Sequence, residues 1–342
     1  MKFALTEEQA ELTAAARNYL DRTYPATRIA ELADGPGHDI DAWPELVRQG
    51  WLDADLGMVE CALLAEEGGR ALHPVPWWAT TVALPAYRAA GVEPPPGPVT
   101  WGDGASGGRA TARPGGEWRL HGAVPAVVQA EVAVTVVVAA QTPDGLALFA
   151  VRRDAPGVSL VTPTAIDPLR TTSRVTLADA PARCLVDPPA APGLLAAIDA
   201  RATTLLACEA VGVADRALEF AVAHAQSRVQ FDRPIGSFQA VSQSLADSYA
   251  ELELARSLGY RAACVLQDAT ENPADAVACA AYAGARVGVR VCEAAIQVCG
   301  GMGVTWEFPL HWWFRRALWL EAAITERSAP LDILAAALFG ER

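Results

Sequence analysis

The stretch RVQFDRPIGSFQ, residues 228–239, lies between two long helical patterns and is far less hydrophobic than either. It places cations, an aromatic ring and a Pro-Gly turn at the point where two helices meet. A second stretch, QVCGGMGVTWE, residues 297–307, carries three glycines whose backbone amides are open to close approach. Together the two stretches could hold the phosphates and the ring system of a large anionic cofactor.

The chain around these stretches, from about residue 190 to 339, is rich in Ala and Leu and reads as helical. Four long apolar patterns with short connections are typical of an up-down helical bundle. The patterns run near residues 192–227, 238–267, 273–299 and 309–338.

The first 95 or so residues also read as helical. Thr6 followed by acids and by Gln9 predicts a capping box at the start of a helix. A further helix is predicted over Met58–Ala71. The Pro-rich stretch Val92–Pro98 ends this helical part, because proline cannot continue a helix.

The middle of the chain has a different texture, with short β-branched runs separated by turns. Val132–Val138 and Ala147–Val151 flank the turn Pro143–Gly145 and predict a hairpin. Short strands of this kind indicate an antiparallel barrel or sandwich. We therefore predict three consecutive domains, at residues 1–97, 98–188 and 189–342.

The bulk composition excludes several classes of protein. With 342 residues, 52% of them hydrophobic and 20% charged, the chain is long and apolar enough for a large core. The net charge of -13 argues against nucleic-acid binding, which needs a basic surface, but local arginines can still bind a small polyanion. We expect no membrane span.

The seven cysteines are scattered and show no metal-ligand spacing. We interpret them as small core residues in a reducing compartment, and we expect no metal site. The N-terminus lacks the apolar core of a signal peptide, so the prediction for location is the cytoplasm.

The order of a helical N-terminal domain, a β middle domain and a C-terminal four-helix bundle resembles the acyl-CoA dehydrogenases. The motif R-x-x-F-x-x-P-I-G-x-F-Q, followed by Leu245-Ala246-Asp247, resembles that family's flavin diphosphate segment. Gln297-x-x-Gly300-Gly301-x-Gly303 resembles its second flavin contact. The resemblance is strong over about residues 200–320, and the stretch 305–317 is similar to a bacterial, actinobacterial branch of shorter chains.

The resemblance implies an FAD-dependent enzyme that desaturates an acyl-CoA thioester and passes electrons to an acceptor. In that family FAD lies across a subunit interface. By resemblance, Arg228 pairs with the diphosphate, Phe231 packs on a cofactor ring, and Gln297 and the amides of Gly300 and Gly301 bond the adenosine diphosphate portion. Alternatively, the arginines are solvated loop charges and the glycines only turn the chain.

Two departures from the family pattern bear on catalysis. In that family a Thr-Glu-Pro segment and then a Trp followed by a hydroxyl residue and Asn contact the flavin ring. The corresponding stretches here are residues 101–107 and 121–129, and the family's Trp and its hydroxyl neighbour are missing from them. The two positions where the family places its catalytic Glu correspond to Ile324 and Ala202, neither of which is an acid. Glu209 is flanked by apolar residues two helical turns after Ala202, so it is either a functional acid or the partner of a buried Arg.

Three hypotheses follow. The chain is a subunit of a heteromeric α2β2 acyl-CoA dehydrogenase of the kind that acts on steroid side-chain CoA esters, and a second, unlike acyl-CoA dehydrogenase chain carries the base. The alternative is a self-sufficient homomeric dehydrogenase with Glu209 as its base. A third hypothesis is a non-catalytic relative or a flavin-free lyase, against which the intact set of flavin-contact residues argues.

Overall fold

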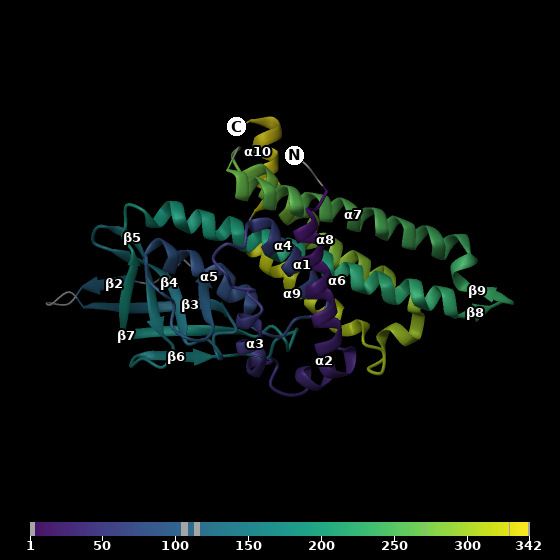
Figure 1. Ribbon diagram of the computed structural model, residues 1–342, viewed down its shortest axis with the longest axis horizontal. Helices are drawn as coiled ribbons and strands as arrows, with labels where there is room; N and C mark the ends of the chain where they lie inside the picture. Colours follow the sequence, from purple (N-terminus) through teal and green to yellow (C-terminus); the bar gives the residue numbers. More distant parts are fainter. Residues whose placement is uncertain (1–3, 104–108, 113–116, 270, 328, 341–342) are drawn as a thin grey trace. The chain divides into compact units, whose positions relative to one another are not determined.

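The computed structural model describes residues 4–103, 109–112, 117–269, 271–327 and 329–340 (Figure 1). It divides into two compact units, each made of separate stretches of chain. Unit 1 contains residues 1–34, 55–73 and 200–342, and unit 2 contains residues 35–54 and 74–199. N-terminal helical segments are therefore grouped with the C-terminal bundle, whereas the three consecutive domains stay a prediction.

Unit 1 is helical throughout apart from one small hairpin. Its helices are α1 (Glu7–Thr23), α2 (Ala26–Ala33), α4 (Met58–Arg70), α6 (Ala191–Ser227, whose first residues belong to unit 2), α7 (Gln239–Asp268), α8 (Ala274–Cys299), η3 (Gly300–Val304), α9 (Leu310–Arg327) and α10 (Pro330–Phe339). The first three bundle helices confirm their predictions within two residues. The prediction of one continuous fourth helix is wrong, because Pro330 starts a new helix after α9 ends.

The predicted capping box at the start of α1 is present. The Thr6 hydroxyl accepts a hydrogen bond from the Gln9 N–H at 3.2 Å, and the Gln9 side-chain oxygen accepts one from the Thr6 N–H at 3.0 Å. These two bonds satisfy backbone donors that the first helical turn leaves without partners.

Glycines bring helices α4 and α6 together backbone against backbone. A Cβ atom on Gly212 would lie 1.8 Å from the carbonyl oxygen of Glu66, and one on Gly69 would lie 2.1 Å from the carbonyl oxygen of Glu209. No side chain larger than hydrogen fits either position, so the two glycines set the distance between the helices.

A buried charge network joins the same helices to α7. The Glu66 carboxylate accepts hydrogen bonds from Arg256 Nε at 2.9 Å and from the Tyr260 hydroxyl at 2.7 Å. Burial raises the pKa of Glu66, and the Arg256 charge opposes that effect. Arg70, one turn further along α4, pairs with Asp215 of α6. These pairs fix which faces of the helices meet, because any other packing would leave a charge buried without a counter-charge.

One helical segment, Ala274–Val304, is long and apolar enough by length and composition to cross a membrane, with a mean hydropathy of 1.3. The expectation of no membrane span stays a prediction. A buried bundle helix meets the same criterion, and α8 packs against both α7 and α9. The finding is weak evidence for a membrane span.

Unit 2 consists of strands and short helices. Its elements are η1 (Ile40–Ala42), α3 (Trp43–Arg48), α5 (Trp77–Ala89), β1 (Val99–Asp103), β2 (Arg109–Ala112), β3 (Trp118–Val128), β4 (Thr135–Thr142), β5 (Gly145–Arg152), β6 (Val158–Val161) and β7 (Thr172–Val186). The pairings β1–β4–β5–β7–β3–β1 close into a ring, as in the predicted barrel. Most pairs are antiparallel as expected, but β1 and β4 run parallel.

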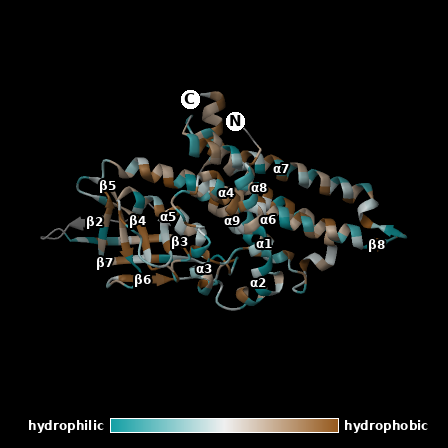
Figure 2. Cartoon of the chain, in the orientation of Figure 1, coloured by the Kyte–Doolittle hydropathy of each residue, from teal (hydrophilic) through white to brown (hydrophobic). Residues whose placement is uncertain are grey.

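The interior of this ring is apolar. Figure 2 shows hydrophobic stretches along its strands. Leu120, Val136 and Phe149 come from three different strands and are fully buried. The predicted hairpin is confirmed: Thr142 pairs with Gly145, which turns the chain at a φ of +126°. The strand β4 begins at Thr135 rather than at Val132, because the Val132 N–H is bonded to the Gln129 carbonyl in a turn.

Candidate cofactor-binding site

A short β-hairpin leads from α6 into α7 and carries the first group of predicted contacts. Its strands are β8 (Val229–Gln230) and β9 (Arg233–Pro234), followed by the single turn η2 (Ile235–Ser237). The Ile235 N–H donates to the Arg228 carbonyl at 2.8 Å and closes the base of the hairpin. The two turn residues, Phe231 and Asp232, have φ values of +52° and +63°. This conformation matches the twist of a two-residue hairpin, but it is uncommon for residues other than glycine.

The hairpin presents its functional side chains to the outside of unit 1. The Phe231 side chain is 86% exposed, which is unusual for a phenylalanine. Arg228 is also exposed, and within the part of the chain that the structure describes no hydrogen bond or ion pair engages its guanidinium. A cation and a ring are thus available to a ligand outside this unit.

The second group of predicted contacts lies where α8 ends. Gln297 is exposed in the last turn of the helix. Gly300 has a φ of +61°, and a Cβ atom on Gly300 or Gly301 would meet nothing within 4 Å. The Gly300 N–H already donates to the carbonyls of Ile296 and Gln297, so this residue contributes an open backbone surface rather than a free donor.

The order of the bundle brings these two groups to the same end. The hairpin reverses the chain between α6 and α7, and the short connection Ala269–Pro273 reverses it again between α7 and α8 (Figure 1). The C-terminal ends of α6 and α8 therefore point the same way. Residues about 70 positions apart in sequence thus share one end of the bundle.

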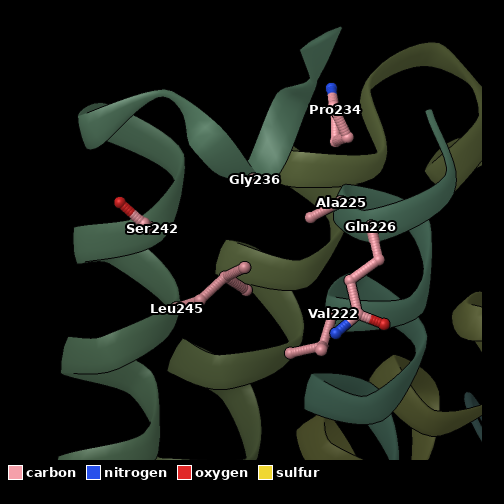
Figure 3. A pocket seen from close by; sticks show the side chains of 7 residues that line it. All are labelled: Val222, Ala225, Gln226, Pro234, Gly236, Ser242 and Leu245. Carbon is pink, nitrogen blue, oxygen red and sulfur yellow. The ribbon is translucent and has the colours of Figure 1, made fainter. Parts of the chain in front are cut away.

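A cavity of about 370 Å³ lies beneath the hairpin (Figure 3). Its lining comes from the end of α6, from the hairpin and from the start of α7. The lining is mostly apolar, with one carboxamide and one hydroxyl: Val222, Ala225, Gln226, Pro234, Gly236, Ser242 and Leu245.

Glu209, the candidate acid, is paired in the interior of unit 1. The Arg316 guanidinium of α9 donates to its Oε1 at 2.6 Å, and the two side chains are 0% and 4% exposed. This is the buried-arginine arrangement that the sequence left open as one of two alternatives. Ile324 and Ala202, where the family places its base, are both fully buried.

Residues 121–129, which correspond to a flavin-ring contact segment of the family, belong to β3 and the residue after it and are packed into unit 2. Val127 and Val128 are buried, and Gln129 has a φ of +50° and an exposed fraction of 2%. The Gln129 side-chain amide lies 3.5 Å from the Pro74 carbonyl, at the limit of a hydrogen bond. The other expected segment, residues 101–107, lies partly outside the described residues.

Some contacts of the site could not be read from the sequence. The Arg233 guanidinium lies 4.0 Å from the centre of the Phe238 ring, and this ring meets Phe231 edge-on at 6.1 Å. Arg316 as the partner of Glu209 was likewise not identified. In the sequence, each of these two contacts is indicated only by a charged residue within an otherwise apolar or aromatic stretch.

Comparison with known proteins identifies the family of this chain. Residues 200–323 match the family model "Acyl-CoA dehydrogenase, C-terminal domain". Acyl-CoA dehydrogenase IpdE2 of Mycobacterium tuberculosis is 31% identical over 304 residues, which cover 86% of this chain and 85% of that protein.

Two solved structures are similar over nearly the whole chain. The Tcur3481-Tcur3483 steroid ACAD variant is 30% identical with a TM-score of 0.83 over 97% of this chain and 99% of that one. The ChsE4-ChsE5 complex from Mycobacterium tuberculosis is 26% identical with a TM-score of 0.88 over the full length of both chains. On its helical bundle, its β middle part and these relatives, the chain belongs to the acyl-CoA dehydrogenase family.

Proposed function

We propose that this chain is a subunit of a heteromeric, FAD-dependent acyl-CoA dehydrogenase. In this proposal it supplies cofactor contacts to a second, unlike acyl-CoA dehydrogenase subunit, and that subunit carries the catalytic base. The observation that carries the proposal is an imbalance within one chain. The outward-facing contacts at Arg228 and Phe231 are complete, whereas the base positions Ile324 and Ala202 are apolar and buried.

The residues present fit the diphosphate and adenosine end of FAD. Arg228 offers an exposed guanidinium, which suits the paired oxygens of a diphosphate. Phe231 offers an exposed ring for stacking, and Gln297 offers a carboxamide beside open glycine backbone. These residues would hold FAD, which would supply the hydride acceptor for oxidation of the acyl group. This chain's own residues bind and orient the cofactor and remove no proton.

Glu209 acts structurally in this proposal. A base must reach the α-proton of the substrate, whereas the Glu209 carboxylate is held by Arg316 inside the bundle. In the homomeric alternative Glu209 is the base, so that alternative requires the pair to open and the carboxylate to become accessible.

The finer assignments rest on the relatives. The similar structures of a steroid ACAD and of the ChsE4-ChsE5 complex support an unlike partner and, as substrate, an acyl-CoA whose acyl group is a steroid side chain. A separate protein accepts the electrons. The cytoplasm stays the expected location, and all seven cysteines are free thiols.

The test is co-purification with an unlike acyl-CoA dehydrogenase chain, which is first sought among the genes that neighbour this one. The wild-type complex is expected to hold FAD, seen as flavin absorbance, and to oxidise an acyl-CoA. Arg228→Ala should lose most of the FAD, because a charge-assisted contact contributes about 1.5–3 kcal/mol, or roughly 10- to 150-fold in affinity.

Arg286→Ala is the matched control. Arg286 is an exposed arginine of α8 that also lies over an aromatic ring, that of Tyr282 at 5.4 Å, and is remote in sequence from the hairpin. Full FAD content in the Arg228→Ala complex would defeat the proposal. A yellow, active preparation of this chain alone would instead favour the homomeric alternative.

A further inference from the structure

We propose that Arg233 is a positioning residue: through Phe238 it holds Phe231 and the hairpin turn in the conformation that presents Phe231 and Arg228 to the cofactor. This inference rests on the proposed function, because it assigns a role at the same site. It divides the two hairpin arginines by task, with Arg228 as the contact and Arg233 as the support.

The turn needs support because its backbone is strained. Phe231 and Asp232 are consecutive residues with positive φ, and neither is glycine. A bulky side chain in that region is destabilising, and such strain persists only where the surroundings enforce it. The hairpin is only two residues long on each strand, so its ladder alone provides few hydrogen bonds.

An aromatic platform crosses the turn and provides that support. The Arg233 guanidinium stacks on the Phe238 ring at 4.0 Å, well within the range of a cation–π interaction. The same Phe238 ring meets Phe231 at 6.1 Å and 83°, the edge-to-face geometry that aromatic pairs prefer. The contacts therefore run from Arg233 through Phe238 to Phe231.

The platform is anchored to the bundle. Phe238 precedes α7 directly, and its carbonyl accepts hydrogen bonds from the backbone N–H groups of Val241 and Ser242 at 3.0 Å. The backbone that carries the ring is thus fixed by the first turn of a 30-residue helix. Phe231, in the turn, and Arg233, directly after it, both lie against the Phe238 ring.

The two arginines differ in what they contact. The Arg233 guanidinium is occupied by Phe238, whereas no described hydrogen bond or ion pair engages the guanidinium of Arg228. An arginine already stacked on a ring in the free chain is placed to stiffen the hairpin. The competing possibility, direct binding of the diphosphate by Arg233, predicts a different size of effect and a different salt dependence.

The first experiment uses the full chain alone. The protein is labelled with fluorophenylalanine, the Phe231 signal is assigned with Phe231→Leu, and Arg233→Ala, Arg233→Lys and Arg286→Ala are compared. In Arg233→Ala we expect the Phe231 signal to move towards the value of a free ring. The Ile235 N–H, which closes the hairpin, should exchange roughly 2- to 5-fold faster.

Lysine retains a cation, so in Arg233→Lys the Phe231 signal and the Ile235 N–H exchange rate should stay close to their wild-type values. Arg286→Ala should change neither quantity. An unchanged ring signal and unchanged Ile235 exchange in Arg233→Ala would overturn the proposal.

The second experiment uses the assembled complex and measures the rate of FAD loss at several salt concentrations. A positioning role predicts a roughly 2- to 5-fold faster loss for Arg233→Ala, with the salt dependence of the wild type. A loss at least about 10-fold faster with a weaker salt dependence would mean that Arg233 binds the diphosphate itself, which contradicts the proposal. A changed hairpin in the free chain with wild-type FAD loss in the complex would also overturn it. If Arg228→Ala retains FAD, the proposed function itself fails, whatever the free chain shows.

Discussion

The buried pair Glu209–Arg316 allows a test that separates structure from catalysis. The perturbation is a double-mutant cycle with Glu209→Met, Arg316→Met and the double variant, which replaces both charges by apolar chains of similar length. Both side chains are almost inaccessible, and their charged atoms are 2.6 Å apart. Removing one partner takes its counter-charge away from the other, which stays buried.

The magnitude follows from these distances. At an effective dielectric constant of about 20, charges 2.6 Å apart attract by roughly 6 kcal/mol, and desolvation of the two ions offsets much of this. Each single variant should therefore lose about 3–5 kcal/mol of unfolding free energy. The double variant should lose much less than the sum of the two, with a coupling energy of at least about 2 kcal/mol.

The assay is urea denaturation followed by circular dichroism. For a slope of about 3 kcal/mol per molar urea, a loss of about 4 kcal/mol lowers the midpoint by about 1.3 M. Glu209→Gln, the smallest change, is assayed in parallel for acyl-CoA oxidation in the assembled complex, where folded enzyme should stay active. A Glu209→Met chain as stable as wild type, together with an inactive Glu209→Gln complex, would refute the structural role and identify Glu209 as the base.

Two further predictions concern packing and thiol chemistry. Gly212→Ala forces a Cβ to within 1.8 Å of the Glu66 carbonyl and should cost at least about 3 kcal/mol, seen as a lower melting temperature. Gly193→Ala in the same helix meets open space and should gain about 0.5–1 kcal/mol instead; equal melting temperatures for the two would contradict the close contact. Burial and the nearby Asp187 charge raise the pKa of Cys184 to about 11. At pH 8 the ionised fraction of this thiol is therefore about one part in 1,000, whereas about a quarter of an ordinary thiol is ionised. Iodoacetamide should label it roughly 200-fold more slowly than a thiol of ordinary pKa and faster as the pH approaches 11, and rapid labelling at pH 8 would show that the pKa of this thiol is not raised.

Much of the fold could be predicted because its signals are local. The capping box at Thr6, the hairpin between β4 and β5 and the first three bundle helices each depend on residues a few positions apart. The prediction of the last helix was wrong because a single proline interrupts an apolar pattern that otherwise continues. The apolar run that ends the chain reads as one helix, but Pro330 divides it.

Contacts between side chains or strands far apart in the sequence could not be predicted from local patterns. The sequence shows Glu209 in an apolar run, but whether that carboxylate faces a substrate or Arg316 depends on how α6 and α9 pack. In the same way, the parallel pairing of β1 with β4 depends on how the barrel closes.

The sequence by itself determined the helical bundle, the β middle part, the polar connection with Arg228 and Phe231, and the glycines after α8, because backbone conformation and hydrophobic periodicity are encoded over a few neighbouring residues. Only the tertiary structure decided that Glu209 is held by Arg316, that Gly69 and Gly212 join α4 to α6, and that Arg233 stacks on Phe238. These contacts depend on where elements far apart in sequence, or side chains across a turn, come to lie. Packing of the whole core sets those positions, and no short stretch of sequence encodes them.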